Sequence, residues 1–156
     1  MQYFDLNEIG MLVLRIAVAY IYLHGAYMIG STKKRRQIGI QRTSILFGDL
    51  NSNKYHQALT IFAFSSALSF MTIGSLLILS GISIKLGALM LIIFTIPAIL
   101  VHKRESVKSH LLAERIIKGC NGTIHEDVHL LANFSHAGHR SSGNKNYMLL
   151  AVNIYL

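Results

Sequence analysis

Residues 59–80 read LTIFAFSSALSFMTIGSLLILS and residues 86–101 read LGALMLIIFTIPAILV, with only the short segment GISIK (81–85) between them. The first run is long enough to cross a hydrocarbon core of about 30 Å at about 1.5 Å per helical residue. The second run reaches that length when the isoleucines of the short segment are added. Lys85, in the short segment, is the only charged residue in the sequence from 59 to 101. The pattern predicts a transmembrane hairpin with helices at residues 59–80 and 82–101.

The composition of the whole chain agrees with a membrane protein. Of its 156 residues 52% are hydrophobic and only 14% are charged, and the mean hydropathy is +0.44. The acidic start, MQYFDLNE, lacks the basic region of a signal peptide, so the apolar run at 9–30 is expected to be retained as a helix. A last apolar run, 147–156, covers only half a bilayer, so either the given chain ends early or it carries a half-helix. We expect one all-α domain over residues 1–156: a four-helix transmembrane bundle whose fourth helix is short or truncated.

Two polar segments, 31–57 and 102–146, separate the apolar runs and hold most of the lysines and arginines. Such an excess of basic residues is typical of cytoplasmic loops, so we expect both segments in the cytoplasm and the N-terminus outside. The first segment opens with a basic run that suits a topology signal or a contact with anionic lipid headgroups. No nucleic-acid recognition motif accompanies this run, which argues against nucleic acid as a partner. Its members are Lys33, Lys34, Arg35 and Arg36.

The second polar segment, 102–146, begins with a pattern that predicts an amphipathic helix on the membrane surface over 106–119. It then becomes rich in histidine, and HEDVH (125–129) matches the H-E-x-x-H form that can hold zinc. The spacing to a third histidine, His136 or His139, does not match the metzincin pattern, and no substrate-cleft domain surrounds the motif. We therefore expect a solvated polar helix without a metal. The candidate ligands, were a metal bound, are His125, Glu126, His129, His136 and His139.

The first helix, 9–30, carries polar side chains on two opposite faces. Arg15 and His24 are nine residues apart, which at about 100° per residue puts them on opposite sides. Arg15 shares its face with Tyr22, and His24 shares the other with Tyr20 and Tyr27. Snorkelling of Arg15 and an interfacial position of His24 are the alternatives to a buried role. We expect the Arg15 face to pack inside the chain and the other face to dock against a second copy or a partner subunit. The room for that inner packing comes from small residues of the second helix: Ala63, Ala67 and Gly74.

No reaction follows from residue chemistry alone. One cysteine allows neither an intramolecular disulfide nor a C-x-x-C redox pair, and the chain has no glycine-rich phosphate loop or Ser-His-Asp order.

The segments LRIA (14–17), YLHG (22–25) and GSLLILSGISIKLGAL (74–89) resemble the DoxX family of small four-helix membrane proteins. That family has an arginine and then a His-Gly pair in its first helix, and a G-x-x-x-[RK]-L-x-A-L hinge between its second and third helices. Some members are subunits of a thiosulfate:quinone oxidoreductase, and others take part in redox and thiol stress responses. Many relatives also carry an acidic residue just before the glycine of the second helix, whereas residues 70–74 here read FMTIG.

The resemblance leaves two functions of different classes open. The first is a quinone-linked oxidoreductase module, in which Arg15 donates a charge-assisted hydrogen bond to the quinone and His102 titrates. Tyr22 and His24 are then candidates for holding the quinone, which would be the one cofactor. The second is a non-catalytic accessory subunit of a larger membrane complex. The missing acidic residue and the polar groups on both faces of helix 9–30 favour the second. A metal-binding membrane protein, acting through residues 125–139, is a remote third alternative.

Overall fold

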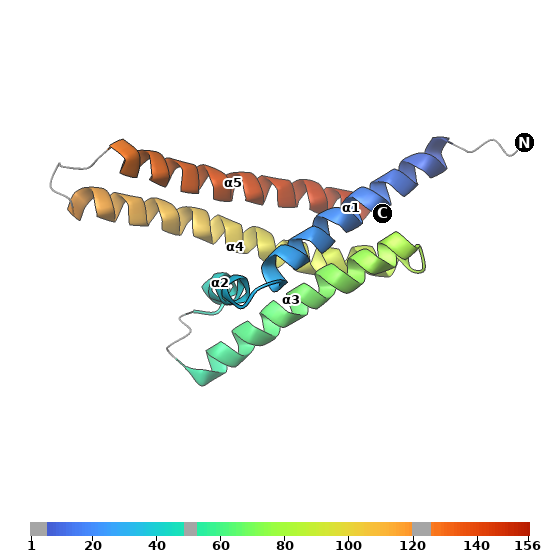
Figure 1. Cartoon of the computed structure of the whole chain (residues 1–156), viewed down its shortest axis with the longest axis horizontal. Coiled ribbons are helices and arrows are strands. Elements are labelled where there is room, and N and C mark those ends of the chain that lie inside the picture. Colours follow the sequence, from blue (N-terminus) through green and yellow to red (C-terminus); the bar gives the residue numbers. More distant parts are fainter. Residues whose placement is uncertain (1–5, 49–52, 120–125) are drawn as a thin grey trace, which may run out of the picture.

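The computed structural model describes residues 6–48, 53–119 and 126–156, with only the backbone for 113, 117, 119, 126–129 and 132. The described residues form helices throughout, without a strand, which confirms the all-α class. In chain order the elements are α1 Leu6–Gly30, α2 Lys33–Thr43, η1 Ser44–Leu46, α3 Lys54–Ser80, α4 Ile84–Gly119 and α5 Glu126–Tyr155. Figure 1 shows α4 and α5 side by side and α1 crossing toward α3. The start of α1, the end of α5 and the α3–α4 turn lie at one end of the molecule.

Three helices of the described chain are long and apolar enough to cross a membrane: α1, α3 and α4. This finding confirms the expected multi-pass membrane class. It does not confirm four spanning helices, because residues 147–156, expected as a short fourth helix, lie at the end of the 30-residue α5. The preceding part of α5 is rich in His, Ser and Asn, so α5 is long enough to cross but too polar to count as a span.

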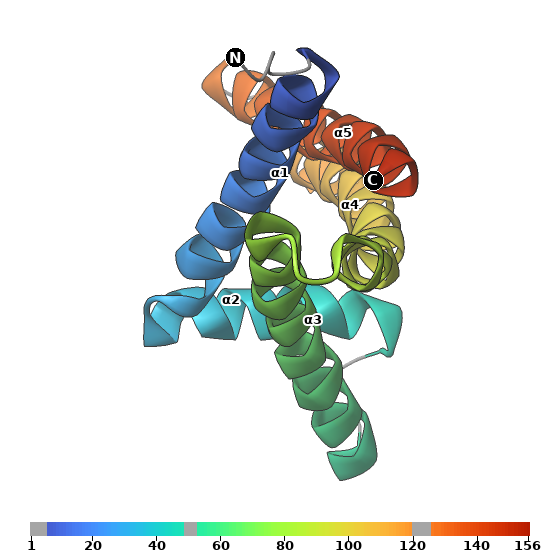
Figure 2. The ribbon, with the colours of Figure 1, turned by 90° about the vertical axis from the view of Figure 1, so that its right-hand side faces the viewer.

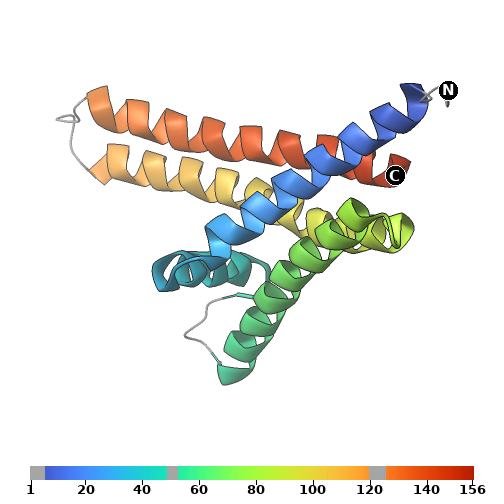
Figure 3. The same cartoon turned by 45° about the vertical axis from the view of Figure 1, so that its right-hand side comes forward.

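The third helix is longer than the sequence predicted. We expected it to end at residue 101 and a separate surface helix to follow at 106–119, but α4 is one helix of 36 residues that continues through Pro97. Residues 102–118 contain neither glycine nor proline, so nothing in the local sequence ends the helix. The polar part of α4 instead packs along α5, as Figure 3 shows. The structure therefore does not confirm a separate amphipathic helix, because residues 106–119 belong to α4.

The α3–α4 hairpin is closed by glycine. Gly81 caps α3 with φ 72°, in the left-handed region that favours glycine, and its N–H donates to the carbonyl of Ile78. Below the turn the two helices touch through Gly74 and Gly87: a methyl group on Gly87 would lie 2.6 Å from the Gly74 carbonyl oxygen. Small residues allow such close backbone approach between membrane helices. Gly74 therefore packs against α4, and not against α1 as the sequence suggested.

Helix α1 packs through the face that its periodicity predicted. Val18, Ala19, Tyr22 and Ala26 are buried, and all of them except Ala19 join residues of α3 and α4 in the main core cluster. The opposite face is open: the rings of Tyr20 and Tyr27 are 66% and 67% exposed. Helix α2 crosses α3 partway along its length, as Figure 2 shows, and begins at an N-cap, Thr32.

Candidate functional site

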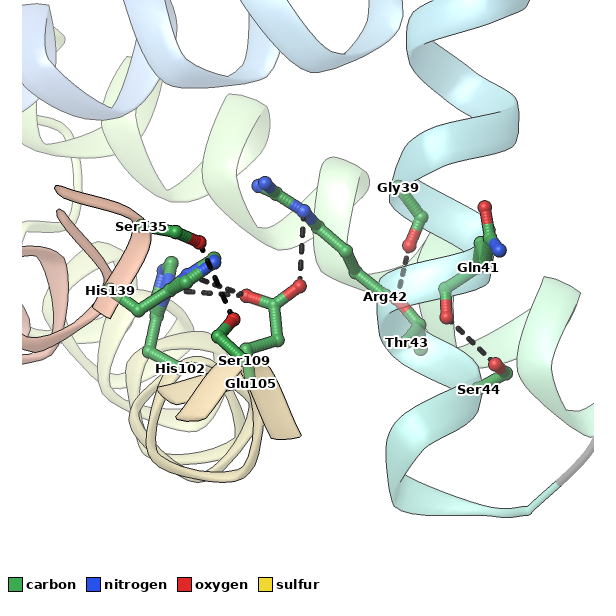
Figure 4. A network of polar contacts seen from close by, with 10 residues as sticks. All are labelled: Gly39, Gln41, Arg42, Thr43, Ser44, His102, Glu105, Ser109, Ser135 and His139. Atoms are coloured by element: carbon green, nitrogen blue, oxygen red, sulfur yellow. Dashed lines mark hydrogen bonds and ion pairs between the residues drawn. The ribbon is translucent and has the colours of Figure 1, made fainter. Parts of the chain in front are cut away.

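A cluster of ionisable side chains forms where α4 leaves its apolar stretch. His102 and Glu105 are three residues apart on α4, so they share a face. His139 reaches them from α5, and Arg42 from α2. Figure 4 shows the two imidazoles on one side of the Glu105 carboxylate and Arg42 on the other. We call these four residues the His–Glu cluster.

The distances in the His–Glu cluster centre on Glu105. One carboxylate oxygen, Oε1, lies 3.1 Å from Nε of Arg42. The other, Oε2, lies 3.2 Å from Nδ1 of His139 and 3.6 Å from Nδ1 of His102. The Glu105 side chain is only 9% exposed, whereas Arg42 is 51% exposed. Each oxygen of a nearly buried carboxylate therefore faces nitrogen atoms from other parts of the cluster.

The hydrogen bonding of the cluster is incomplete. Oε2 of Glu105 and Nδ1 of His102 are buried and have no hydrogen-bond partner. Such buried polar atoms cost free energy, so they are rare outside functional sites. His102 lies just after the apolar stretch of α4. The cluster thus places a buried imidazole nitrogen and a buried carboxylate oxygen next to each other without a hydrogen bond to satisfy them.

Two contacts hold the cluster together from the side of the first polar segment. The Arg42–Glu105 pair links α2 to α4, and Nη1 of Arg104 donates to the carbonyl oxygen of Ile45 at 2.9 Å. Both join residues 31–57 to the polar part of α4. The two polar segments, predicted to lie on one side of the membrane, are therefore in direct contact.

Cavities adjoin the cluster on several sides. An apolar cavity of about 520 Å³ lies between α1, α2, α3 and α4, and its charged or ionisable lining residues are Arg35, Arg42, His102 and Glu105. The rest of its lining is mostly apolar and includes Phe64 and Ala67. A second cavity of about 280 Å³, lined by His102 and His139, lies between α4 and α5. An open groove of about 1020 Å³ between α2 and α4 also reaches Glu105 and His139.

The structure brings together two of the histidines singled out in the sequence, His102 and His139, but adds a residue that sequence reasoning missed. Glu105 was not among the candidates, although its i, i+3 spacing from His102 was a readable signal.

The other histidine candidates are not part of the His–Glu cluster, although His136 lines the cavity between α4 and α5 together with His102 and His139. His136 bonds to Ser106, with 3.1 Å between Nδ1 and Oγ, and its ring centroid lies 5.7 Å from that of His110. His125 lies outside the described residues. Glu126 and His129 are in the first turns of α5, but their side chains are outside the description.

Arg15 does not join His102, contrary to the paired role that the sequence suggested. A methyl group added to Gly81 would lie 3.1 Å from Nη1 of Arg15, so this guanidinium rests against the α3–α4 turn. The 18 residue steps from Ile84 to His102 span about 27 Å of helix. The two candidates are therefore far apart along the bundle. Nε of Arg15 is buried without a hydrogen-bond partner.

The two candidates for holding the quinone, Tyr22 and His24, do not line the apolar cavity. The Tyr22 hydroxyl is 2.7 Å from Oγ1 of Thr95 and accepts from Nδ2 of Asn153 at 2.8 Å, inside the core. His24 is exposed, and its ring stacks on Tyr20 with centroids 5.8 Å apart. The basic run, Lys33, Lys34, Arg35 and Arg36, is also exposed at the start of α2. Within the run, Nη1 of Arg35 donates to Oγ of Ser31 at 3.0 Å, and Arg35 also lines the apolar cavity.

Comparison with known proteins gives one match. No curated protein and no solved structure matches the chain. The DoxX family model matches residues 10–104, more than half of the chain, including α1, α3 and α4 up to Arg104. Glu105 and His139 lie beyond the matched residues. On this match, the chain belongs to the DoxX family.

Proposed function

We propose that the chain is the quinone-binding membrane subunit of a larger redox complex. The observation that carries the proposal is the apolar cavity of about 520 Å³ whose lining includes Arg42, His102 and Glu105. Ligand sites are commonly of this size, mostly apolar, with a few polar groups that fix orientation. A quinone has the matching form, since its ring carbonyls accept hydrogen bonds and its isoprenoid tail is apolar.

The residues of the cavity would have different roles in binding a quinone. Arg42 is a charged donor that can reach a ring carbonyl, and a charge-assisted hydrogen bond of this kind is stronger than a neutral one. Phe64 and Ala67 belong to the part of the cavity that would take the tail. Reduction of the quinone to the quinol takes up two electrons and two protons. With a single cysteine the chain has no dithiol pair to supply electrons, so a partner subunit provides them.

Glu105 changes the balance between the two functions that the sequence left open. The absence of an acidic residue in 70–74 favoured an accessory subunit without a site. A carboxylate reaches the same cavity from α4 instead, at a position that follows the end of the family match. This placement favours a quinone-linked role.

The experiment is photolabelling of the full chain in lipid nanodiscs with a short-chain ubiquinone analogue that carries an azido group. We expect label on peptides of α2, α3 or α4, competed by unlabelled ubiquinone. Ala67→Leu, which adds bulk inside the cavity, should weaken competition about tenfold, or about 1.4 kcal/mol. Ala17→Leu makes the same change on the exposed face of α1 and should have no effect. Equal behaviour of the two variants would contradict the proposal.

A docking role is favoured by a separate observation, the exposed face of α1. Tyr20, His24 and Tyr27 lie together there, with Tyr20 66% exposed. A tyrosine hydroxyl inside a membrane requires a partner from protein or water. We propose that a second copy or a partner subunit covers this face, which is compatible with quinone binding by the opposite side of the bundle.

For sidedness we propose that both polar segments are cytoplasmic and that the N-terminus and the α3–α4 turn are outside. The positive-inside bias of residues 31–57 and 102–146 supports this orientation. Single cysteines at Ser44 and Ser83, in a background without Cys120, test it with a membrane-impermeant maleimide. Labelling of Ser83→Cys alone from outside the cell is expected. Labelling of Ser44→Cys would reverse the orientation.

A further inference from the structure

We infer that His102, Glu105 and His139 form a binding site for a divalent first-row transition metal, with Zn²⁺ as the ion that best matches the donor set. Each of the three residues offers one ligand atom, and these atoms lie within 4.8 Å of one another. Two imidazole nitrogens and one carboxylate oxygen are a ligand set that zinc uses in sites that keep a position open. The inference stands on these three residues and does not depend on quinone binding.

Two of the three separations between ligand atoms match those of a tetrahedral metal site, and the third, between the two imidazoles, is no more than 4.8 Å. A tetrahedral zinc site with metal–ligand distances of about 2.0–2.1 Å separates its ligand atoms by about 3.3–3.4 Å. Oε2 of Glu105 lies 3.2 Å from Nδ1 of His139 and 3.6 Å from Nδ1 of His102. Both values are close to this separation. The ligands also come from two facing helices, with two of them at i, i+3 on α4, an arrangement typical of metal sites in helical bundles.

The state of Glu105 is a second, independent observation that points to a ligand. Its side chain is nine-tenths buried, and Oε2 makes no hydrogen bond, although it lies within ion-pair distance of Nδ1 of His139 and near Nδ1 of His102, which also has no hydrogen-bond partner. A metal ion would satisfy both atoms at once. The other oxygen, Oε1, is held by Nε of Arg42 at 3.1 Å. Outer contacts of this kind orient a ligating carboxylate and raise metal affinity.

The surroundings provide access and room for a fourth ligand. The cavity of about 280 Å³ borders His102 and His139, and the open groove between α2 and α4 borders Glu105 and His139. An ion can therefore enter from the polar side of the bundle, and a water molecule or a ligand oxygen can occupy the remaining position. This site is different from the H-E-x-x-H motif at 125–129, which was the metal-binding candidate in the sequence. The side chains of that motif lie outside the description.

The test is a Zn²⁺ titration of the full-length protein in detergent micelles, after removal of metal with a chelator, against a competing chromophoric indicator. It is done in a His125→Ala/His129→Ala background, so that the sequence motif cannot contribute. We expect one Zn²⁺ per chain, with affinity at least tenfold weaker in His139→Ala and in Glu105→Gln. His136→Ala is the matched control: it is three residues from His139 on the same helix, outside the cluster, and should leave affinity unchanged.

A second measurement covers the case in which a variant fails to fold. Co²⁺ added to the otherwise unaltered protein in the same background should give the visible absorption of a four- or five-coordinate site, and Zn²⁺ should abolish it. The inference is overturned if that background binds no ion, if no such absorption develops, or if His136→Ala weakens binding as much as His139→Ala. Failure of quinone photolabelling with Zn²⁺ binding intact would leave the metal site standing and remove only the proposed function.

Discussion

Two polar groups of residues within one apolar bundle differ in almost every respect. The first, Tyr22, Thr95 and Asn153, is neutral and buried in the core, and short hydrogen bonds of 2.7 and 2.8 Å join its members. The second, the His–Glu cluster, contains two charged residues and adjoins three cavities. The first group joins α1, α4 and α5, and the second joins α2, α4 and α5. The two groups therefore stabilise different sets of contacts around the same pair of helices.

The difference indicates which group serves stability and which serves function. In the core group every member has a hydrogen bond, and Thr95 also donates to the carbonyl oxygen of Leu91. Only Oδ1 of Asn153 is without a partner. In the His–Glu cluster the two unpartnered atoms face each other next to open space. A neutral, bonded network specifies packing, whereas an incompletely bonded ionisable cluster beside a cavity is the usual setting of a binding site.

The largest stability effect is predicted for the core group. Tyr22→Phe removes the hydroxyl that Asn153 donates to and that Thr95 contacts, and it leaves those buried groups short of a partner. We expect the free energy of unfolding to fall by about 1–3 kcal/mol. Thermal unfolding in detergent measures this, and Zn²⁺ affinity should stay unchanged. If Tyr22→Phe weakened Zn²⁺ binding but left stability intact, the division between the two groups would be wrong.

A smaller stability effect is predicted for Glu105→Gln, although it disrupts the His–Glu cluster. The Arg42 guanidinium is half exposed, so water can replace its carboxylate partner, and such pairs contribute about 1 kcal/mol or less. We expect a fall in the free energy of unfolding within that range, while Zn²⁺ affinity falls at least tenfold. Arg42→Gln is the control for the ion pair itself. A loss of stability as large as that of Tyr22→Phe would show that Glu105 is a packing residue.

What the sequence predicted depended on local pattern. The apolar runs located α1, α3 and the first part of α4 because the bilayer demands a fixed apolar length. Spacing at 100° per residue identified the inner face of α1, since only one face could meet the rest of the chain. The turn at Gly81 could be predicted because glycine, which lacks a Cβ atom, adopts turn conformations easily.

What the sequence did not predict depended on distant partners. The polar half of α4 and the histidine-rich half of α5 are helices that pack on each other, and charged residues look alike in a solvated loop and on a paired helix. Glu105 has its partners only because α2 crosses the bundle and brings Arg42, and because α5 packs back on α4 and brings His139. The sequence around residue 105 contains no signal for either of these long-range contacts. The same holds for Arg15 and His102, whose shared role failed because the length of α4 separates them.

The smallest stability effect is predicted for a third polar position, Tyr20, which is two residues from Tyr22 but on the outer face of α1. Its ring is 66% exposed, so no packing in this chain depends on its hydroxyl. Tyr20→Phe should change the free energy of unfolding of the isolated chain by no more than about 0.5 kcal/mol.

Position 20 can be used to test whether another protein chain covers the outer face of α1 in the membrane. A photocrosslinking amino acid at position 20 should form adducts with a second copy or with a partner subunit, because the exposed face of α1 also carries His24 and Tyr27, whose polar groups are costly in lipid. The same probe at position 22 should crosslink only within the chain, to α4 or α5, since Tyr22 lies against Thr95 and Asn153. If both probes gave adducts only within the chain, lipid and water would have to satisfy the outer face, and the docking role would lose its support. If only the probe at position 20 crosslinked to another chain, the outer tyrosines would be part of an interface, and the inner hydrogen-bond network would hold that face of α1 in position.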